Sequence, residues 1–175
     1  MKYTLHNHDR IRKMIDLRTG DEDMEYTTLG NTDIKISKLC VGCMSFGKAG
    51  TMHDWTLDET EKVVKHALSL EINFFDTANG YSAGTSEEYL GKALKKNIAR
   101  DQVVIASKVY FNPGRLSAEA IHRETDGTLK RLGTDYRDLY IIHRFDYETP
   151  MEETSGLTGS RWGNTTGRRN RICRS

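Results

Sequence analysis

Residues 72–82 read INFFDTANGYS, in which a short apolar run ends on Asp76 and an Asn-Gly pair leads on to Tyr81. An apolar run of this length, bounded by turn residues, predicts a buried strand over 72–78. Aspartate is rarely buried unless it has a partner. We therefore expect Asp76 to meet a basic group where this strand ends.

A β-hairpin and three further strands are predicted around this run. The segments MEYTTLG and IKISKLCVG flank the turn-rich 31–33 and predict a β-hairpin, and LCVGCMSFG continues as a strand. The β-branched run QVVIASKVY, 102–110, predicts the strand after 72–78, and DLYIIHR, 138–144, predicts one more.

Helix signals fall between these strands. Thr56–Glu59 and Thr85–Glu88 both fit a capping box ahead of a helical apolar stripe. Ser117 can cap a third helix that runs through Leu132 and stops at Gly133. A strand–helix alternation after a hairpin predicts an α/β fold with a parallel sheet and right-handed crossovers. The pattern alone leaves a closed barrel and an open sheet as alternatives.

The composition is that of one polar domain, with 37% hydrophobic and 29% charged residues in a chain of 175. No apolar run approaches the roughly 18 residues of a membrane span, and the N-terminus lacks the apolar core of a signal peptide. It is basic, as transit peptides are, but Asp9 and Asp16 argue against that reading. Three cysteines without a signal peptide favour a reducing compartment, so we expect a cytoplasmic protein without membrane partners.

Both ends differ in composition from the centre. Residues 1–23 are polar and aperiodic, which predicts a disordered extension. Residues 149–153 begin a helix signal, but 155–175 carry five arginines, four glycines and no acid, which predicts a basic tail beyond a domain of 24–154. The tail is a solvated segment or a contact for RNA or a membrane surface. The rest of the chain has 21 basic and 25 acidic residues, which argues against a nucleic-acid-binding face.

Several short motifs fail their context tests. Cys40 and Cys43 fit a redox C-x-x-C, but the surroundings predict a strand where a redox pair needs a helix N-terminus. Gly42 to Lys48 begins like a phosphate-binding loop, yet Ala49 stands where Ser or Thr is required. No G-x-G-x-x-G occurs, and no second ligand pair completes a zinc site.

The ionisable residues at the strand ends are the candidate catalytic groups. Asp76, Lys108 and His143 each follow the apolar part of a predicted strand, and Tyr81 lies in the loop after the first. In a parallel α/β sheet the carboxyl ends of strands gather ligands, so these side chains are expected at one mouth. A structural ion-pair network is the alternative that the residues leave open.

The chemistry of the four groups is complementary. A lysine ammonium stabilises a phenolate, and an aspartate keeps that lysine charged and oriented. A histidine can donate a hydrogen bond to a substrate oxygen or relay a proton. Together they suit protonation of a carbonyl oxygen as its carbon gains a hydride.

At these residues the chain resembles the aldo-keto reductase family. The similar segments are INFFDTANGYSAGTSEEYLGKAL, VVIASKV and LKRLGTDYRDLYIIHRFD, and the likeness extends over about 24–153. GCMSFG, HDWTL and KVYF are most similar to the aryl-alcohol-dehydrogenase-like branch. The resemblance implies a (β/α)8 TIM barrel whose N-terminal hairpin closes the bottom, and NADPH-dependent reduction of an aldehyde or ketone.

The resemblance also assigns roles. It implies that Tyr81 is the general acid, that Lys108 and Asp76 tune it, and that His143 orients the carbonyl. Gly42, Cys43 and Met44 match the loop near the nicotinamide, which Asp76 also borders.

A barrel of this kind needs about 250 residues, and the matching part supplies a hairpin and about four βα units. The family places most cofactor contacts in the half that is not matched here. We therefore expect a partial barrel that is weakly active or inactive, from a truncated product. The alternative is a non-enzymatic half-barrel that self-associates through its open sheet edges, at LCVGCMSF and DLYIIHR.

Overall fold

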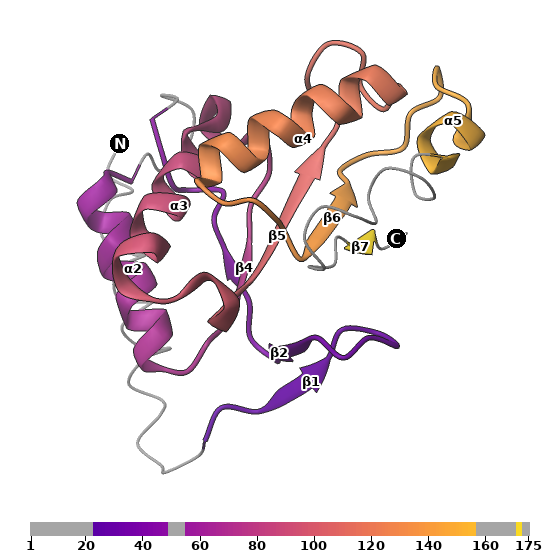
Figure 1. Ribbon diagram of the computed structural model, residues 1–175. Coiled ribbons are helices and arrows are strands. Elements are labelled where there is room, and N and C mark those ends of the chain that lie inside the picture. The colour runs from indigo at the N-terminus through magenta and orange to yellow at the C-terminus, as the bar shows by residue number, and fades with distance from the viewer. Residues whose placement is uncertain (1–22, 49–54, 157–170, 173–175) are drawn as a thin grey trace, which may run out of the picture.

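The computed structural model describes residues 23–48, 55–156 and 171–172 (Figure 1). An antiparallel hairpin of β1 (Tyr26–Thr28) and β2 (Lys35–Ser37) comes first. A parallel sheet follows in the order β3-β4-β5-β6-β7. Its strands are β3 (Val41–Gly42), β4 (Phe74–Asp76), β5 (Val104–Val109), β6 (Leu139–Ile142) and β7 (Arg171–Ile172). The predicted α/β partial barrel is confirmed.

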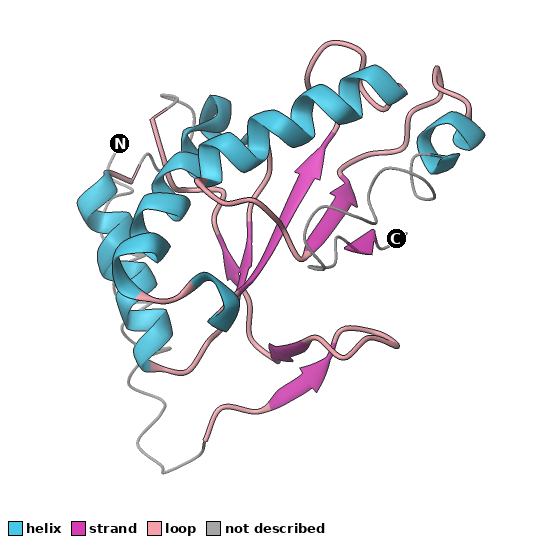
Figure 2. Cartoon of the chain, viewed as in Figure 1, coloured by secondary structure: helices cyan, strands magenta, loops and turns pink. Residues whose placement is uncertain are grey.

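Helices α2 (Leu57–Ser69), α3 (Thr85–Asn97) and α4 (Ala118–Leu132) connect successive strands of the sheet. Figure 2 shows them together along one side of the strands. The hairpin lies apart from them, and Asn73, directly before β4, holds it there: its side chain accepts from Ser37 N at 2.8 Å. The hairpin is therefore attached where β4 begins, as the expected closure of a barrel bottom requires.

Two predicted helix caps form as expected. Thr56 accepts from Glu59 N while the Glu59 carboxylate accepts from Thr56 N, a complete capping box on α2. Ser117 caps α4, and Gly133 ends that helix in the left-handed conformation at φ 66°. Local sequence signals therefore suffice to place these helix ends.

The predicted capping box at Thr85–Glu88 is wrong. Gly84 is the residue before α3, and it has no side chain to cap with. Thr85 Oγ1 donates instead to Ser82 O at 2.6 Å, and Ser86 Oγ donates to Cys43 O at 2.7 Å. Both hydroxyls serve long-range and loop contacts, which the local pattern does not reveal.

The strand register separates two faces of the sheet. Phe75 and Ile105 are paired neighbours and point into the core with the helices. Asp76 and Lys108, one and three positions further on, belong to the opposite face because side chains alternate along a strand. The main core lies under α2 and α3; its buried members are Met24, Cys43, Phe46, Val64, Ala67, Ile72, Phe75, Leu90, Ala93, Leu94, Val103, Ile105 and Leu132.

The C-terminal part of the sheet differs from the expected bare edge. β7 pairs in parallel with β6, with Leu139 opposite Arg171 and Tyr140 opposite Ile172. The open edge predicted at 138–144 is therefore partly covered, by residues of the predicted basic tail. Helix α5 (Met151–Gly156) also crosses the predicted boundary at 154. Of the predicted N-terminal extension, 1–22 lies outside the described residues.

In the part of the chain that the structure describes, no helix combines the length and apolarity needed to cross a bilayer.

Close packing of α3 against α4 depends on Gly91, since a Cβ there would lie 2.3 Å from Leu132 O. We expect Gly91→Ala to lower the free energy of unfolding by about 1–3 kcal/mol, because the backbone of α4 must move. Urea unfolding followed by circular dichroism measures it. Gly127→Ala is the matched control, since its Cβ would meet only the flexible Arg131 guanidinium at 2.9 Å. An equal loss in both variants would contradict the packing explanation.

Candidate active site

The ammonium of Lys108 is the centre of the candidate site. Its Nζ donates to Asp76 Oδ2 at 2.7 Å, to Thr77 O at 2.9 Å and to the Tyr81 hydroxyl at 3.1 Å. The Lys108 side chain is 13% exposed and that of Asp76 29%. The ammonium thus meets three oxygen acceptors, its full donor capacity.

Backbone pairing between neighbouring elements sets this geometry. β4 and β5 pair Asp76 with Ala106, and the chain beyond β4 continues along β5, with Thr77 N donating to Ala106 O and Asn79 N to Lys108 O. This pairing brings the end of β4 level with Lys108. The loop must then turn back at once to return Tyr81.

A left-handed turn follows Tyr81. Ser82 and Ala83 have φ 48° and 52°, and Gly84 follows at φ 90°. Ordinary L-residues avoid this region because their Cβ crowds the backbone. Directly before this turn, the Tyr81 hydroxyl lies 3.1 Å from the Lys108 ammonium, which also lies 4.6 Å from the centre of the ring.

His143 joins the site from β6. Its backbone N–H donates to Val109 O at 3.1 Å. Its ring packs edge-on against Tyr81, with ring centres 5.5 Å apart, and against Phe111, at 5.0 Å. Within the described residues its buried Nδ1 has no hydrogen-bond partner. Packing against two rings therefore orients the imidazole.

Burial is the main reason why the pKa of His143 lies below its ordinary value of 6.5. The positive charges of Lys108 and Arg144 lower this pKa further, and Asp76 opposes them. The neutral imidazole is the favoured form in the folded chain. A neutral ring can still donate one hydrogen bond to a substrate oxygen.

Besides Asp76, the predicted cofactor positions are three residues at the end of β3 and directly after it, and they differ in what they offer. Gly42 is paired with Asp76, and nothing lies within 4 Å of where its Cβ would be. Met44 is 50% exposed. The side chain of Cys43 is fully buried in the core, so this residue can face a ligand only through its backbone. Burial also raises the pKa of Cys43 well above its usual range, which opposes redox use of the thiol.

The sequence interpretation missed several residues around the mouth. Thr77 supplies a backbone acceptor, Phe111 is 56% exposed beside His143, and Asn79 and Glu124 form a buried pair with Asn79 Nδ2 donating to Glu124 Oε2 at 3.1 Å. The sequence did contain a signal for Glu124. Its position in α4 has the spacing of the buried residues, and an acid at such a position indicates a buried carboxylate with partners.

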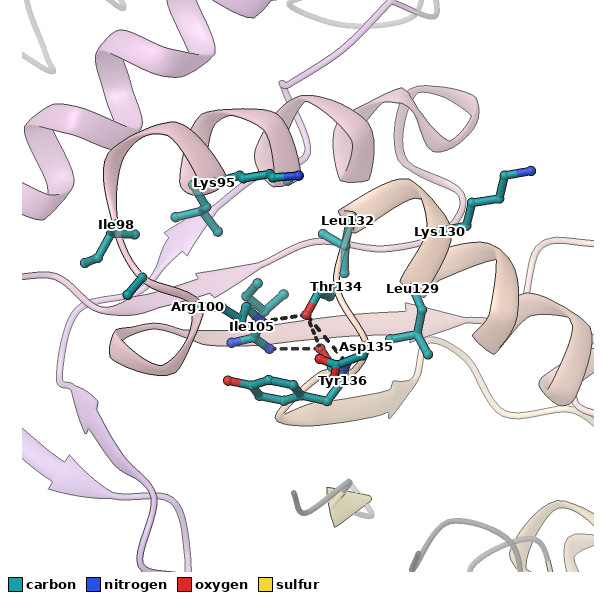
Figure 3. Close-up of a pocket in the computed structure, with 14 residues that line it drawn as sticks. Lys95, Ile98, Arg100, Ile105, Leu129, Lys130, Leu132, Thr134, Asp135 and Tyr136 are labelled. Atoms are coloured by element: carbon teal, nitrogen blue, oxygen red, sulfur yellow. Dashed lines mark hydrogen bonds between the residues drawn. The ribbon is translucent and has the colours of Figure 1, made fainter. Parts of the chain in front are cut away.

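A cavity of about 750 Å³ lies elsewhere, between the C-terminal ends of α3 and α4 (Figure 3). Its lining includes none of the predicted catalytic residues. Arg100 is fixed there by Asp138 at 2.8 Å and by the carbonyls of Val103 and Tyr136. Figure 3 shows Lys130 pointing away from the cavity, so its charge is not directed at an occupant.

A pH dependence follows from His143. Its lowered pKa means that the unfolded chain binds this proton more readily, so the stabilisation is complete above 6.5 and is lost as the pH falls through the folded-state pKa. We expect the unfolding free energy of the native chain to fall between about pH 7 and about pH 5. The unfolding free energy of His143→Gln should fall less over the same pH range, and urea unfolding at both pH values measures the difference. His66→Gln, on the exposed end of α2, is the control; an unchanged pH slope in His143→Gln would contradict the assignment.

Known proteins are similar to most of this chain. The sequence profile of the aldo/keto reductase family matches residues 38–157. The chain is 41% identical over 156 residues to versiconal hemiacetal acetate reductase of Aspergillus parasiticus, covering 74% of this chain and 45% of that protein. It is 38% identical over 159 residues to a Schizosaccharomyces pombe protein that carries an aryl-alcohol dehydrogenase name, covering 73% and 45%.

Solved structures give the same result. A thermostable aldo-keto reductase, Tm1743, superposes with a TM-score of 0.72 at 34% identity, covering 86% of this chain and 53% of that one. The holo form of an aldo-keto reductase from Bacillus halodurans gives 0.66 at 32%, covering 77% and 45%. The chain spans about half the length of the relatives it matches. Because the family profile, the relatives and the solved structures all match, this chain belongs to the aldo/keto reductase family.

Proposed function

We propose that this chain carries the proton-transfer site of an NADPH-dependent reductase that converts an aldehyde or ketone to an alcohol. The observation that carries the proposal is the Tyr81 hydroxyl, 3.1 Å from an ammonium that is itself paired with Asp76 at 2.7 Å. A phenol beside a fixed positive charge can give up its proton at lower cost, because the resulting phenolate is stabilised. Family membership supports the same reaction class.

Each of the four residues has one task in this proposal. Tyr81 donates the proton to the carbonyl oxygen, Lys108 stabilises the phenolate that remains, and Asp76 keeps the lysine in place. His143 donates a hydrogen bond that orients the carbonyl, from a ring held beside the Tyr81 ring at 5.5 Å. Proton transfer by a positioned side chain typically contributes about 10²–10⁴-fold in rate.

The residues present fit the nicotinamide end of the cofactor. NADPH supplies the hydride that a carbonyl carbon needs. The exposed Gly42 at the end of β3, next to Asp76, leaves open space for a flat ring, and Met44 is exposed beside it. The chain spans 45% of versiconal hemiacetal acetate reductase. The family resemblance implies that most contacts to the pyrophosphate and adenosine belong to the part that this chain does not match. We therefore propose slow turnover for this chain on its own.

The role of Tyr81 is tested by NADPH oxidation with an aromatic aldehyde. We expect Tyr81→Phe to reduce the rate of the native chain by about 100-fold or more, because the proton donor is lost while the ring remains. Tyr89→Phe, on α3 and away from the mouth, is the matched control and should keep the native rate. Equal rates in the native chain and Tyr81→Phe would refute the assignment.

The free edge of β3 supports a second proposal, self-association. In the described residues β3 pairs only with β4, and its outer edge has no strand partner. Leu39 and Met44 lie two residues before and two residues after β3, and they are 48% and 50% exposed. Unpaired edges with exposed apolar side chains favour pairing with another chain. We propose that two copies of this chain contact each other through this edge.

Size-exclusion chromatography with light scattering tests the association. We expect a mass above one chain at micromolar concentration, and a shift toward one chain in Leu39→Lys, since charge on an edge opposes strand pairing. Tyr147→Lys, an exposed apolar position away from β3, should leave the mass unchanged. A monomeric native chain would contradict the proposal.

A further inference from the structure

Glu124 is a charged residue in an unusual place. It lies on the buried face of α4 between Ile121 and Thr128, and it is 6% exposed. A carboxylate is rarely buried to this extent without strong partners. Its partners therefore indicate why the helix carries it.

All the partners of Glu124 are donors at the mouth of the sheet or next to it. Oε2 accepts from Asn79 Nδ2 at 3.1 Å and from Asn112 Nδ2. Oε1 accepts from Arg123 Nε at 3.2 Å, and Arg123 also donates to Pro113 O. One side chain of α4 thus holds both the loop after β4 and the loop after β5.

These two loops carry the rings of the candidate site. Asn79 lies two residues before Tyr81, and its backbone N–H donates to Lys108 O at 3.0 Å. Asn112 directly follows Phe111, whose ring packs on His143. The two loops also lie close together, since a Cβ at Gly80 would come within 3.6 Å of Phe111.

The amide of Asn79 gives independent support. Asn79 is 3% exposed, and its Oδ1 has no hydrogen-bond partner among the described residues. A buried acceptor without a partner is unfavourable. The side chain keeps this orientation because its NH₂ group donates to Glu124. The hydrogen bond to Glu124 therefore fixes the loop, even though the Asn79 carbonyl oxygen is left without a partner among the described residues.

We propose that Glu124 is a positioning residue that clamps the loops after β4 and β5 together, and so holds the rings of Tyr81 and Phe111 against the ring of His143. The inference rests on the proposed function for its catalytic meaning, but the clamp itself is a property of this chain. A carboxylate suits this task because one oxygen accepts from two amide groups. A glutamine in the same place would direct its own NH₂ group at Asn79 and Asn112 or at Arg123.

The ring of His143 reports on the clamp. It is oriented by Tyr81 and Phe111, and the groups that act on its charge are Lys108 on β5, Asp76 on β4 and Arg144 on its own segment. Release of the two loops would hydrate the imidazole, and burial is the largest cause of its lowered pKa. The pKa of His143 should then rise toward 6.5.

The experiment is an NMR titration of the histidine Cε1 protons in the native chain and in Glu124→Gln, with His143→Gln used to assign the signal. We expect an upward shift of the His143 pKa in Glu124→Gln. Glu87→Gln is the matched control. Glu87 is an equally buried acid that binds Ser107 Oγ at 2.6 Å and Arg131 Nε at 2.6 Å, away from both loops. It should leave the His143 titration unchanged.

The outcomes separate the possibilities. An unchanged His143 pKa in Glu124→Gln overturns the clamp, and so does an equal shift in Glu87→Gln, which would indicate general loosening. If Glu124→Gln does not fold, Asn79→Ala removes the same contact from the loop side and is expected to give the same shift; no shift there overturns the proposal. The titration does not depend on enzymatic turnover. If the Tyr81→Phe assay refuted the proposed function, the titration would still test the clamp by itself.

Discussion

The whole site depends on one buried positive charge. The ammonium of Lys108 is largely removed from water, and a charge in that position is stable only if oxygen atoms replace the water. All three acceptors come from a single stretch, Asp76, Thr77 and Tyr81. The register of β4 beside β5 and the path of the loop that follows β4 deliver all three oxygen atoms to this one lysine. A change in either would leave the ammonium without an acceptor in a place that water hardly reaches.

The same charge decides the state of its neighbours. Asp76 neutralises the ammonium directly, which leaves the pair without net charge. After burial, Lys108 is the next cause that lowers the pKa of His143, so the imidazole stays neutral beside it. A lysine, an aspartate, a phenol and a neutral imidazole together form a site of low net charge. In the proposed reaction, a site of low net charge would favour an uncharged carbonyl compound over an anionic one.

What the sequence can predict follows from how local the signal is. Side chains alternate along a strand, and the strand order is readable from the sequence. Together these predict that Asp76, Lys108 and His143 share a mouth. The hydrogen bonds of Lys108 to Asp76 and to Tyr81 agree with this prediction. The caps at Thr56 and Ser117 are equally local. Glu87 and Glu124 were missed because an acid in an amphipathic helix normally faces solvent, and their partners lie 44 and 45 residues away in the chain. The pairing of β7 with β6 could not be predicted either. It joins residues that are far apart in the chain, and a strand of two residues is too short to show an alternating pattern.

The turn after Tyr81 shows how the site is coupled to the loop proposed for the cofactor. Two consecutive non-glycine residues in the left-handed region cost roughly 1–2 kcal/mol each. Thr85 offsets part of this, because its hydroxyl donates to Ser82 O at 2.6 Å and accepts from Lys48 N at 2.8 Å. Lys48 follows Gly47, where a Cβ would lie 2.4 Å from Thr85 Oγ1, so the contact requires glycine. The hydroxyl that a local pattern assigns to a helix cap instead joins the turn after Tyr81, the proposed proton donor, to Lys48 at the end of the loop that follows β3.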